Sequence, residues 1–423
     1  MNAQAAEKIV RDDASDHEGQ EHGDDNSEAL IAERDYETPA INTMLERVAK
    51  EFGKPYGAQV GELARLCIGG NKLSAEEYYE LRLFDEKYTP EQKLEFIGIR
   101  KSREIWTDAY TDNDFWGVII DKIASGGMFK GLGLPTTETL AIYSGTVSVP
   151  AIESLKDGAD IAAFLRANRN RAMFAKPVSS YQSLGSVAID RVEDDAIRCG
   201  DGTLMPIDEF VRFVTEEFAD GYLFQARVSP HVDIARICGN RIATARIVTT
   251  CVNREADVMR AALKLPVGES MADNFWRGGN IIADVDLKTG RMGRAVSGFG
   301  LDQIETPHHP DTNAPITGTV LPMWREAVDL ALDGQRLLSR IPLIGWDIAI
   351  SNTGPLIIEA NETPDLKMMQ YASGEGMLDG KFRTFVSALR DARAAEKARL
   401  KKKAMKFANA EGARQIKGAM KRA

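Results

Sequence analysis

The spacing of hydrophobic positions changes along the chain, and this change predicts a helical amino-terminal part followed by mixed strands and helices. Between about residues 40 and 110 the pattern is helical, and Ser74-Ala75-Glu76-Glu77 and Thr89-Pro90-Glu91-Gln92 have the form of capping boxes. After the first box, Tyr78, Leu81 and Phe84 fall near one stripe, as in ordinary core packing. From about residue 119 the pattern changes to alternating strands and helices.

Several short apolar runs in this mixed part predict strands at residues 139–143, 173–175, 187–189 and 222–225, and helices at residues 121–133, 207–218 and 322–340. The run at 173–175 is too short and too close to Pro177 for a helix, so we expect a strand that delivers Lys176. Strand-like runs follow, including Ile237 and Ile247, with turns at Asn253-Arg254 and at residues 286–291. They predict an antiparallel sheet.

Two strands near the carboxyl end, residues 345–350 and 356–361, carry the most informative side chains. If their turn centres on Thr353, the hairpin places Asp347 opposite Glu359, and the two-residue repeat puts Asn361 on the same face. Carboxylates about 5 Å apart repel by roughly 3 kcal/mol at an effective dielectric near 20, so we expect positive charge between them. Oxygen ligands in small number suit Mg²⁺, which also takes waters and substrate phosphates. The alternative is that Asp347 pairs with an arginine and that Glu359 caps a local group.

Three further residues could carry chemistry. Lys176 precedes a loop rich in hydroxyl groups, where an ammonium could approach phosphate, although a surface lysine at a strand end is the alternative. Arg246 lies in an apolar strand, so its guanidinium needs either a structural carboxylate or a bound phosphate. His309 lies in a proline-rich loop and is either a surface histidine or a general base.

The charge is distributed unevenly over the 423 residues, whose net charge is −10. Residues 1–40 hold 12 acidic and 3 basic side chains, whereas residues 393–423 hold 11 basic and 2 acidic ones. We expect the first segment to be disordered and the last to form a solvated helix. The basic end could also contact anionic lipid, nucleic acid or the acidic arm of another subunit, but the overall charge gives no reason to expect a nucleic-acid partner.

Targeting and redox signals are few. No apolar run approaches the roughly 20 residues of a membrane helix, and no secretion signal is evident at the amino terminus, so we expect a cytoplasmic protein without a transmembrane segment. The cysteines have no paired spacing, which argues against a zinc site and a disulfide framework and predicts buried free thiols: Cys67, Cys199, Cys238 and Cys251.

Taken in order, these segments resemble the ATP-grasp superfamily, and in particular its sugar-transfer-associated family, from about Glu77 to Gln370. Four motifs carry the resemblance. Asp121-Lys122 through Gly133-Leu134-Pro135-Thr136 is similar to the first nucleotide-side helix, and Phe174-Ala175-Lys176-Pro177-Val178 is similar to the strand whose lysine contacts phosphate. Residues 222–228 are similar to the linker that meets adenine, and Gly345-Trp346-Asp347 with Glu359-Ala360-Asn361 is similar to the magnesium site. Two features depart from the family pattern. The phosphate loop keeps only Gly185 among serines, and Gln225-Ala226 replaces the usual acidic residue of the linker.

The resemblance implies an α+β ATP-grasp fold, in which two α+β subdomains grip ATP. It divides the chain into an acidic disordered tail (1–38), a helical region (39–118), a first subdomain (119–226), a second subdomain with the magnesium site (227–380) and a basic helix or tail (381–423).

The resemblance also implies roles for individual residues. Asp347, Glu359 and Asn361 would hold Mg²⁺, and Arg246 would be catalytic. The candidates for binding ATP are Lys122, Lys176, Ser180, Gln225, Arg227 and, for the ribose, Asp233.

The implied activity is an ATP- and Mg²⁺-dependent ligase that joins a small-molecule carboxylate to an amine or similar nucleophile through an acylphosphate. The family's name suggests a link to a glycan-related pathway. A small-molecule kinase and a non-catalytic nucleotide-binding scaffold that uses the basic tail are the alternatives. The sequence specifies neither the substrates nor the oligomeric state.

Overall fold

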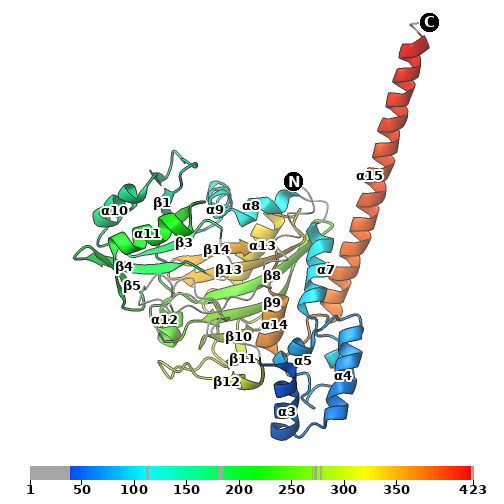
Figure 1. Cartoon of the computed structure of the whole chain (residues 1–423), viewed down its shortest axis with the longest axis horizontal. Coiled ribbons are helices and arrows are strands. Elements are labelled where there is room, and N and C mark those ends of the chain that lie inside the picture. Colours follow the sequence, from blue (N-terminus) through cyan, green and yellow to red (C-terminus); the bar gives the residue numbers. More distant parts are fainter. Residues whose placement is uncertain are drawn as a thin grey trace.

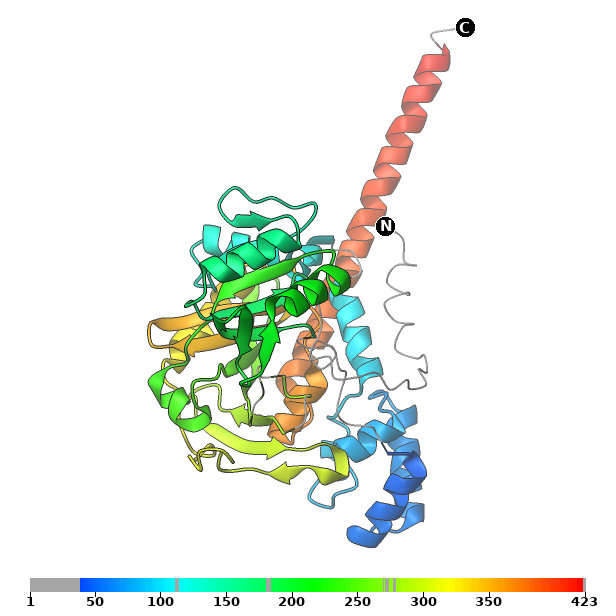
Figure 2. The same cartoon turned by 60° about the vertical axis from the view of Figure 1, so that its left-hand side comes forward.

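A computed structural model describes residues 39–110, 114–179, 184–268, 270, 274–276 and 279–420 of the chain. Its body contains two seven-stranded sheets, a small sheet of order β2-β1-β7-β3-β4-β5-β6 and a large sheet of order β12-β11-β10-β9-β8-β13-β14. Figures 1 and 2 show the small sheet beside one end of the large sheet, with the helices of residues 41–80 at the opposite side of the molecule. The segment expected to be disordered, residues 1–38, lies outside the described residues.

The amino-terminal helices begin where the sequence supplies caps. Both expected capping boxes form, one between Ser74 and Glu77 and the other between Thr89 and Gln92. Asp121 caps the helix that leads into the small sheet, because its carboxylate accepts from the backbone N–H groups of Ile123 and Ala124. The elements are α3 (Ile41–Glu51), α4 (Tyr56–Ile68), α5 (Ala75–Glu80), α6 (Pro90–Lys93), α7 (Ile99–Tyr110), η1 (Asp114–Trp116), α8 (Gly117–Ile120) and α9 (Lys122–Gly131).

The small sheet buries one face under α10 (Gly158–Ala167) and α11 (Ile207–Glu217), where Phe164 and Phe210 pack against Phe224. Its other face carries Leu223, and Lys176 is the strand partner of Leu223 and shares that face. The strands are β1 (Thr139–Tyr143), β2 (Glu153–Leu155), β3 (Met173–Pro177), β4 (Val187–Glu193), β5 (Ala196–Cys199), β6 (Leu204–Pro206) and β7 (Tyr222–Ala226).

The large sheet is covered on one face by α13 (Trp324–Leu337), with residues of α8 and α9 in the same core, and on the other by α14 (Leu366–Ser373) together with helices α3 to α7. Trp346 and its register partner on β8, Ile247, belong to the core on the α13 side, whereas the next residue of β8, Val248, packs on the opposite side. The strands are β8 (Thr244–Val252), β9 (Glu255–Leu265), β10 (Ile281–Val285), β11 (Met292–Ser297), β12 (Ile304–Glu305), β13 (Leu343–Ser351) and β14 (Gly354–Asn361), with η2 (Gly300–Asp302) between β11 and β12.

The expected strand around Ile237 was wrong, because this residue lies in α12 (Val232–Cys238). Ile234, Ile237 and Cys238 are buried, and their spacing of three and four residues is that of one helix face. His231 caps this helix by accepting from the backbone N–H of Asp233 at 3.2 Å. A short helix with apolar residues on one face is easily mistaken for a strand.

The carboxyl-terminal helix α15 (Gly380–Met420) begins against the body and then leaves it, as Figures 1 and 2 show. Phe382, Phe385 and Leu389 are buried in the core, and Arg393 pairs with Asp108 of α7. Beyond this pair the described side chains are almost all exposed as far as Lys406.

No described helix, α15 included, combines the length and the apolar character that a membrane crossing requires. All four cysteines are free, and Cys67 alone among them is only half-buried.

Candidate functional site

The β13–β14 hairpin brings Asp347 opposite Glu359 and Gly345 opposite Asn361. The turn consists of Asn352-Thr353, because Ser351 pairs with Gly354, so the expected centre at Thr353 was wrong. A bulge in β14 compensates, since Ile348 pairs with Ile357 and the next pair is already Asp347 with Glu359. The predicted carboxylate pairing is therefore confirmed, although it arises from a tighter turn and an extra residue in the strand.

Positive side chains from two neighbouring strands hold the Asp347 carboxylate. Arg246 of β8 binds it through two hydrogen bonds, from Nε to Oδ1 at 2.6 Å and from Nη2 to Oδ2 at 3.0 Å. Lys264 of β9 places its Nζ 3.2 Å from Oδ2. Burial would raise the pKa of Asp347, but Arg246 and Lys264 outweigh it and hold that pKa at about 2. The charge expected beside the carboxylates is thus present as the protein's own cations, and Asp347 does pair with an arginine.

Glu359 faces a different cation. Its Oε1 lies 3.4 Å from Nζ of Lys122, the first residue of α9. The amide nitrogen of Asn361 donates to the backbone carbonyl of Gly345 at 3.3 Å, so its carbonyl oxygen is the atom left to meet a cation. Glu359 therefore pairs with α9 and does not cap a local group.

Lys176 is buried beside these residues, with 6% of its surface exposed. Burial lowers the pKa of Lys176 to about 8, Glu359 and Asp347 act to raise it, and Lys122 lowers it further. Within the described part of the chain its ammonium forms no ion pair shorter than 4 Å. Lys176 is therefore a desolvated cation that an incoming anion would stabilise, and a surface lysine is excluded.

The other sequence-predicted ligands are arranged differently. Gln225 is buried, and its Nε2 donates to Oγ1 of Thr139 at 3.4 Å. Arg227 pairs with Asp190 of β4. Ser180 lies outside the described residues.

Asp233 pairs with Arg236 at 2.5 Å on α12. The first residue of α12, Val232, donates its backbone N–H to Asn352 in the hairpin turn at 3.0 Å. Asn352 lies five residues along the chain from Asp347, a distance of about 16 Å in an extended strand. The structure therefore gathers Lys122, Lys176, Arg246, Asp347, Glu359 and Asn361, and holds Arg227 and Asp233 in other contacts.

His309 is fully buried, so the surface position considered from the sequence was wrong. Its Nδ1 accepts from the backbone N–H of Asp311 at 3.3 Å, and its Nε2 lies 3.0 Å from the carbonyl of Pro266, to which it therefore donates. Burial lowers the pKa of His309 and favours the neutral ring. With both nitrogens engaged in the backbone, this residue fixes the loop after β9 and has no nitrogen left for a proton transfer.

Sequence reasoning missed Lys264, which is buried beside Asp347. The sequence did contain a signal for this residue. A lysine between Leu263 and Leu265 in an apolar strand is as unusual as Arg246 in the apolar strand around it. Asp365 was also missed; it caps α14 through the N–H of Met368 and accepts from the indole of Trp276 at 2.8 Å, and its charge acts on Arg246.

We refer to Lys122, Lys176, Arg246, Lys264, Asp347 and Glu359 as the charged cluster. It combines four cations with two carboxylates, a balance that favours a polyanion. Among the described residues no group of three or more His, Cys, Asp or Glu side chains is placed to hold a metal ion. Two carboxylates and the Asn361 oxygen are hard donors that fit Mg²⁺ when a ligand such as a polyphosphate supplies further oxygens.

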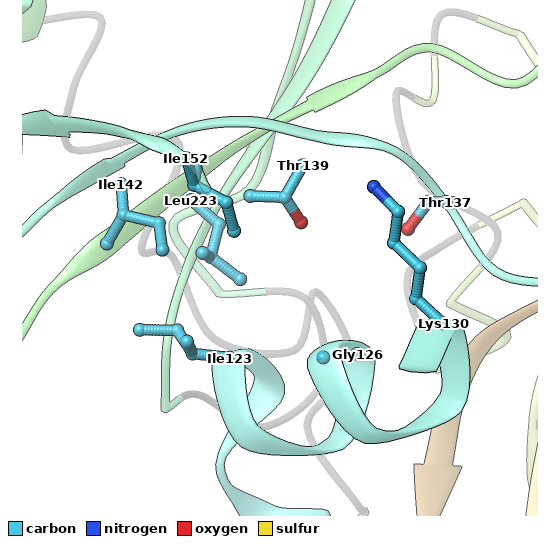
Figure 3. A pocket seen from close by; sticks show the side chains of 9 residues that line it. Ile123, Gly126, Lys130, Thr137, Thr139, Ile142, Ile152 and Leu223 are labelled. Carbon is cyan, nitrogen blue, oxygen red and sulfur yellow. The ribbon is translucent and has the colours of Figure 1, made fainter. Parts of the chain in front are cut away.

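A pocket lies beside the cluster, between α9, β1 and β7, and Figure 3 shows its lining. Ile123 directly follows Lys122 in α9, and Leu223 is the strand partner of Lys176. The walls are largely apolar, and the polar groups are the side chains of Lys130, Thr137 and Thr139. Thr139 connects this pocket to Gln225.

Comparison with known proteins places this arrangement in a family. Residues 103–383 match the family model described as sugar-transfer associated ATP-grasp. No curated protein matches the sequence.

Similar solved structures include a D-alanine–D-alanine ligase from Coxiella burnetii, with 9% identity and a TM-score of 0.39 over 68% of this chain and 62% of that one. The D-alanine–D-alanine ligase from Bacillus anthracis has 12% identity and a TM-score of 0.36 over 66% and 70% of the two chains. An L-amino acid ligase from Bacillus licheniformis has 12% identity and a TM-score of 0.34 over 66% and 48%. The chain thus spans less than two thirds of the length of the first of these proteins. From the family match, which covers most of its length, the chain belongs to the sugar-transfer associated ATP-grasp family and has the ATP-grasp fold.

Proposed function

We propose that the protein is an ATP- and Mg²⁺-dependent ligase that activates a carboxylate as an acylphosphate and joins it to an amine or similar nucleophile. The observation that carries this proposal is the charged cluster, in which four buried or half-buried cations face two carboxylates, together with the carboxamide of Asn361 beside it. Such a set can bind a triphosphate and a divalent ion together, and the family match supports ATP as the source of the triphosphate.

Each residue of the cluster has a role in this proposal. Lys122 and Lys176 bind phosphate oxygens from α9 and β3, and Lys264 approaches them from the large sheet. Asp347, Glu359 and the Asn361 oxygen would hold Mg²⁺, which would neutralise phosphate charge when it is bound.

The reaction would proceed in two steps. A carboxylate oxygen of the substrate attacks the γ-phosphorus, the bond between the γ-phosphorus and the bridging oxygen breaks, and ADP leaves. Arg246 donates N–H groups to the phosphoryl oxygens as this charge develops. The nucleophile then attacks the acyl carbon, loses a proton and displaces inorganic phosphate. Positioning and electrostatic stabilisation thus supply most of the acceleration.

The nucleoside would lie along the face of the small sheet that carries Lys176 and Gln225, near residues 222–228. Ser180 would contribute its hydroxyl from the loop after β3. Arg227 and Asp233 remain candidates for the ribose, each after leaving its present ion pair. We also propose a cytoplasmic location and, from the family description alone, a glycan-related pathway.

The test is an ATP-consumption screen of carboxylates paired with amines, in which ADP and inorganic phosphate are both measured. ADP with free phosphate and an acyl group trapped by hydroxylamine supports the ligase. A stable phosphate ester identifies a small-molecule kinase instead, and nucleotide affinity without turnover identifies a scaffold. Release of AMP overturns the mechanism.

A further inference from the structure

Both oxygens of Asp347 are already in use in the free protein. Oδ1 accepts from Arg246, and Oδ2 lies within 3.2 Å of both Arg246 and Lys264. The three side chains are only 8–11% exposed, so water does little to weaken these contacts. A divalent ion that binds Asp347 must therefore displace a guanidinium or share the carboxylate with it.

The charges around Asp347 oppose a lone metal ion. Arg246 and Lys264 carry two positive charges against the one negative charge of Asp347, and Lys122 balances Glu359. Lys176 adds a further positive charge when it is protonated. Asp365 and Glu362 add negative charge near Arg246 and Glu359, so the opposition to a divalent ion is local. An ion arriving alone meets a carboxylate whose two oxygens are already bound to cations.

A polyphosphate changes this balance. A guanidinium or an ammonium binds phosphate oxygens as strongly as it binds a carboxylate. The phosphate oxygens can therefore replace Asp347 as the partners of Arg246 and Lys264. The stem of Arg246 packs over Gly345, where a side chain would lie 3.3 Å from its Cδ, so the glycine leaves room for the guanidinium stem at this point. Once the two cations face phosphate, the Asp347 oxygens become available to a metal ion.

We propose, on the basis of the function proposed above, that Arg246 and Lys264 act as internal counterions of Asp347, so that the site binds a divalent cation tightly only together with the nucleotide. The two ligands then increase each other's affinity by the same factor, because such coupling is reciprocal. Arg246 and Lys264 are positioning residues for the metal carboxylate, in addition to their contacts with phosphate.

The test measures binding of Mn²⁺, as a probe for Mg²⁺, by electron paramagnetic resonance, and binding of ADP by calorimetry with and without Mn²⁺. For the natural sequence we expect weak Mn²⁺ binding alone and strong mutual enhancement with ADP. In K264M we expect Mn²⁺ alone to bind about tenfold more tightly and the enhancement to shrink, because one opposing charge is gone. K381M, which changes an exposed lysine paired with Asp257, should leave Mn²⁺ binding unchanged.

A second variant keeps the test decisive if K264M does not fold. Arg246→Lys keeps the positive charge but loses the two-pronged contact, so Asp347 should become partly available and Mn²⁺ should bind alone more tightly than to the natural sequence. Mn²⁺ that binds the natural sequence equally well with and without ADP, or variants with unchanged Mn²⁺ affinity, overturn the inference. ADP binding that Mn²⁺ does not alter overturns the inference alone, whereas no ADP binding under any condition overturns the proposed function as well.

Discussion

The buried ammonium of Lys176 is expected to lower the free energy of unfolding of the protein. Burial lowers its pKa from the usual 10.5 to about 8. Keeping the charged form in the folded protein at pH 7 therefore costs about 3 kcal/mol relative to the unfolded chain. Replacing Lys176 by Met keeps the length of the side chain and removes the charge, so K176M should be more stable than the natural sequence at pH 7, by up to about 3 kcal/mol.

The pH dependence follows from the same pKa. Between about pH 8 and pH 10.5 the unfolded chain holds a proton on Lys176 that the folded protein has released. The unfolded state then binds more protons, so the contribution of Lys176 makes the natural sequence more stable as the pH rises through this range. The stability advantage of K176M should consequently be greatest below pH 8 and disappear toward pH 10.5.

Thermal unfolding of both proteins at several pH values between 7 and 10.5 measures this difference, with K381M as the control for loss of an exposed lysine. Added ATP with Mg²⁺ should raise the unfolding temperature of the natural sequence and have little effect on K176M, because the nucleotide supplies the anion that the ammonium lacks. A K176M protein that is less stable at pH 7, or whose difference from the natural sequence does not change with pH, would refute the reasoning.

Three further predictions concern other parts of the molecule. D347N should abolish ATP turnover and destabilise the fold by about 3 kcal/mol, because Arg246 and Lys264 lose their buried carboxylate. The control D333N, which loses an exposed pair with Arg336, should change neither turnover nor stability. Turnover assays and denaturant titrations measure the two effects. G345A should cost about 1–3 kcal/mol in the same titrations, since its Cβ would lie 2.7 Å from Cβ of Pro364, and an unchanged midpoint would contradict this packing. Removal of residues 398–423 should leave the unfolding temperature and ATP turnover unchanged, because the described side chains from Ala398 to Lys406 are exposed; a large fall in either would show that this end contacts the body.

Local signals in the sequence were reliable where neighbouring residues decide the structure. The boxes at Ser74 and Thr89 and the turn at Asn253-Arg254 depend only on residues within one turn, and all three are present. The opposition of Asp347 and Glu359 was also predictable, because the hydrophobic faces of both strands leave few acceptable registers. The turn that produces this pairing was not predictable, because a two-residue turn with a bulge and a symmetric longer turn give the same pairing.

Long-range contacts set the limit of the prediction. Lys264 reaches Asp347 only because β8 lies between β9 and β13 in the sheet. Strand order cannot be predicted from local sequence patterns. The same holds for His309, whose proline-rich loop suggests an exposed residue until the strand end at Pro266 covers it. The cations of the charged cluster were recognisable one by one, but which carboxylate each one meets required the fold.

The far end of α15 has a mechanical consequence. From Arg393, which pairs with Asp108 of α7, to Met420 the helix rises by about 40 Å. A helix of that length acts as a spacer, so a partner bound at its far end would be held away from the charged cluster.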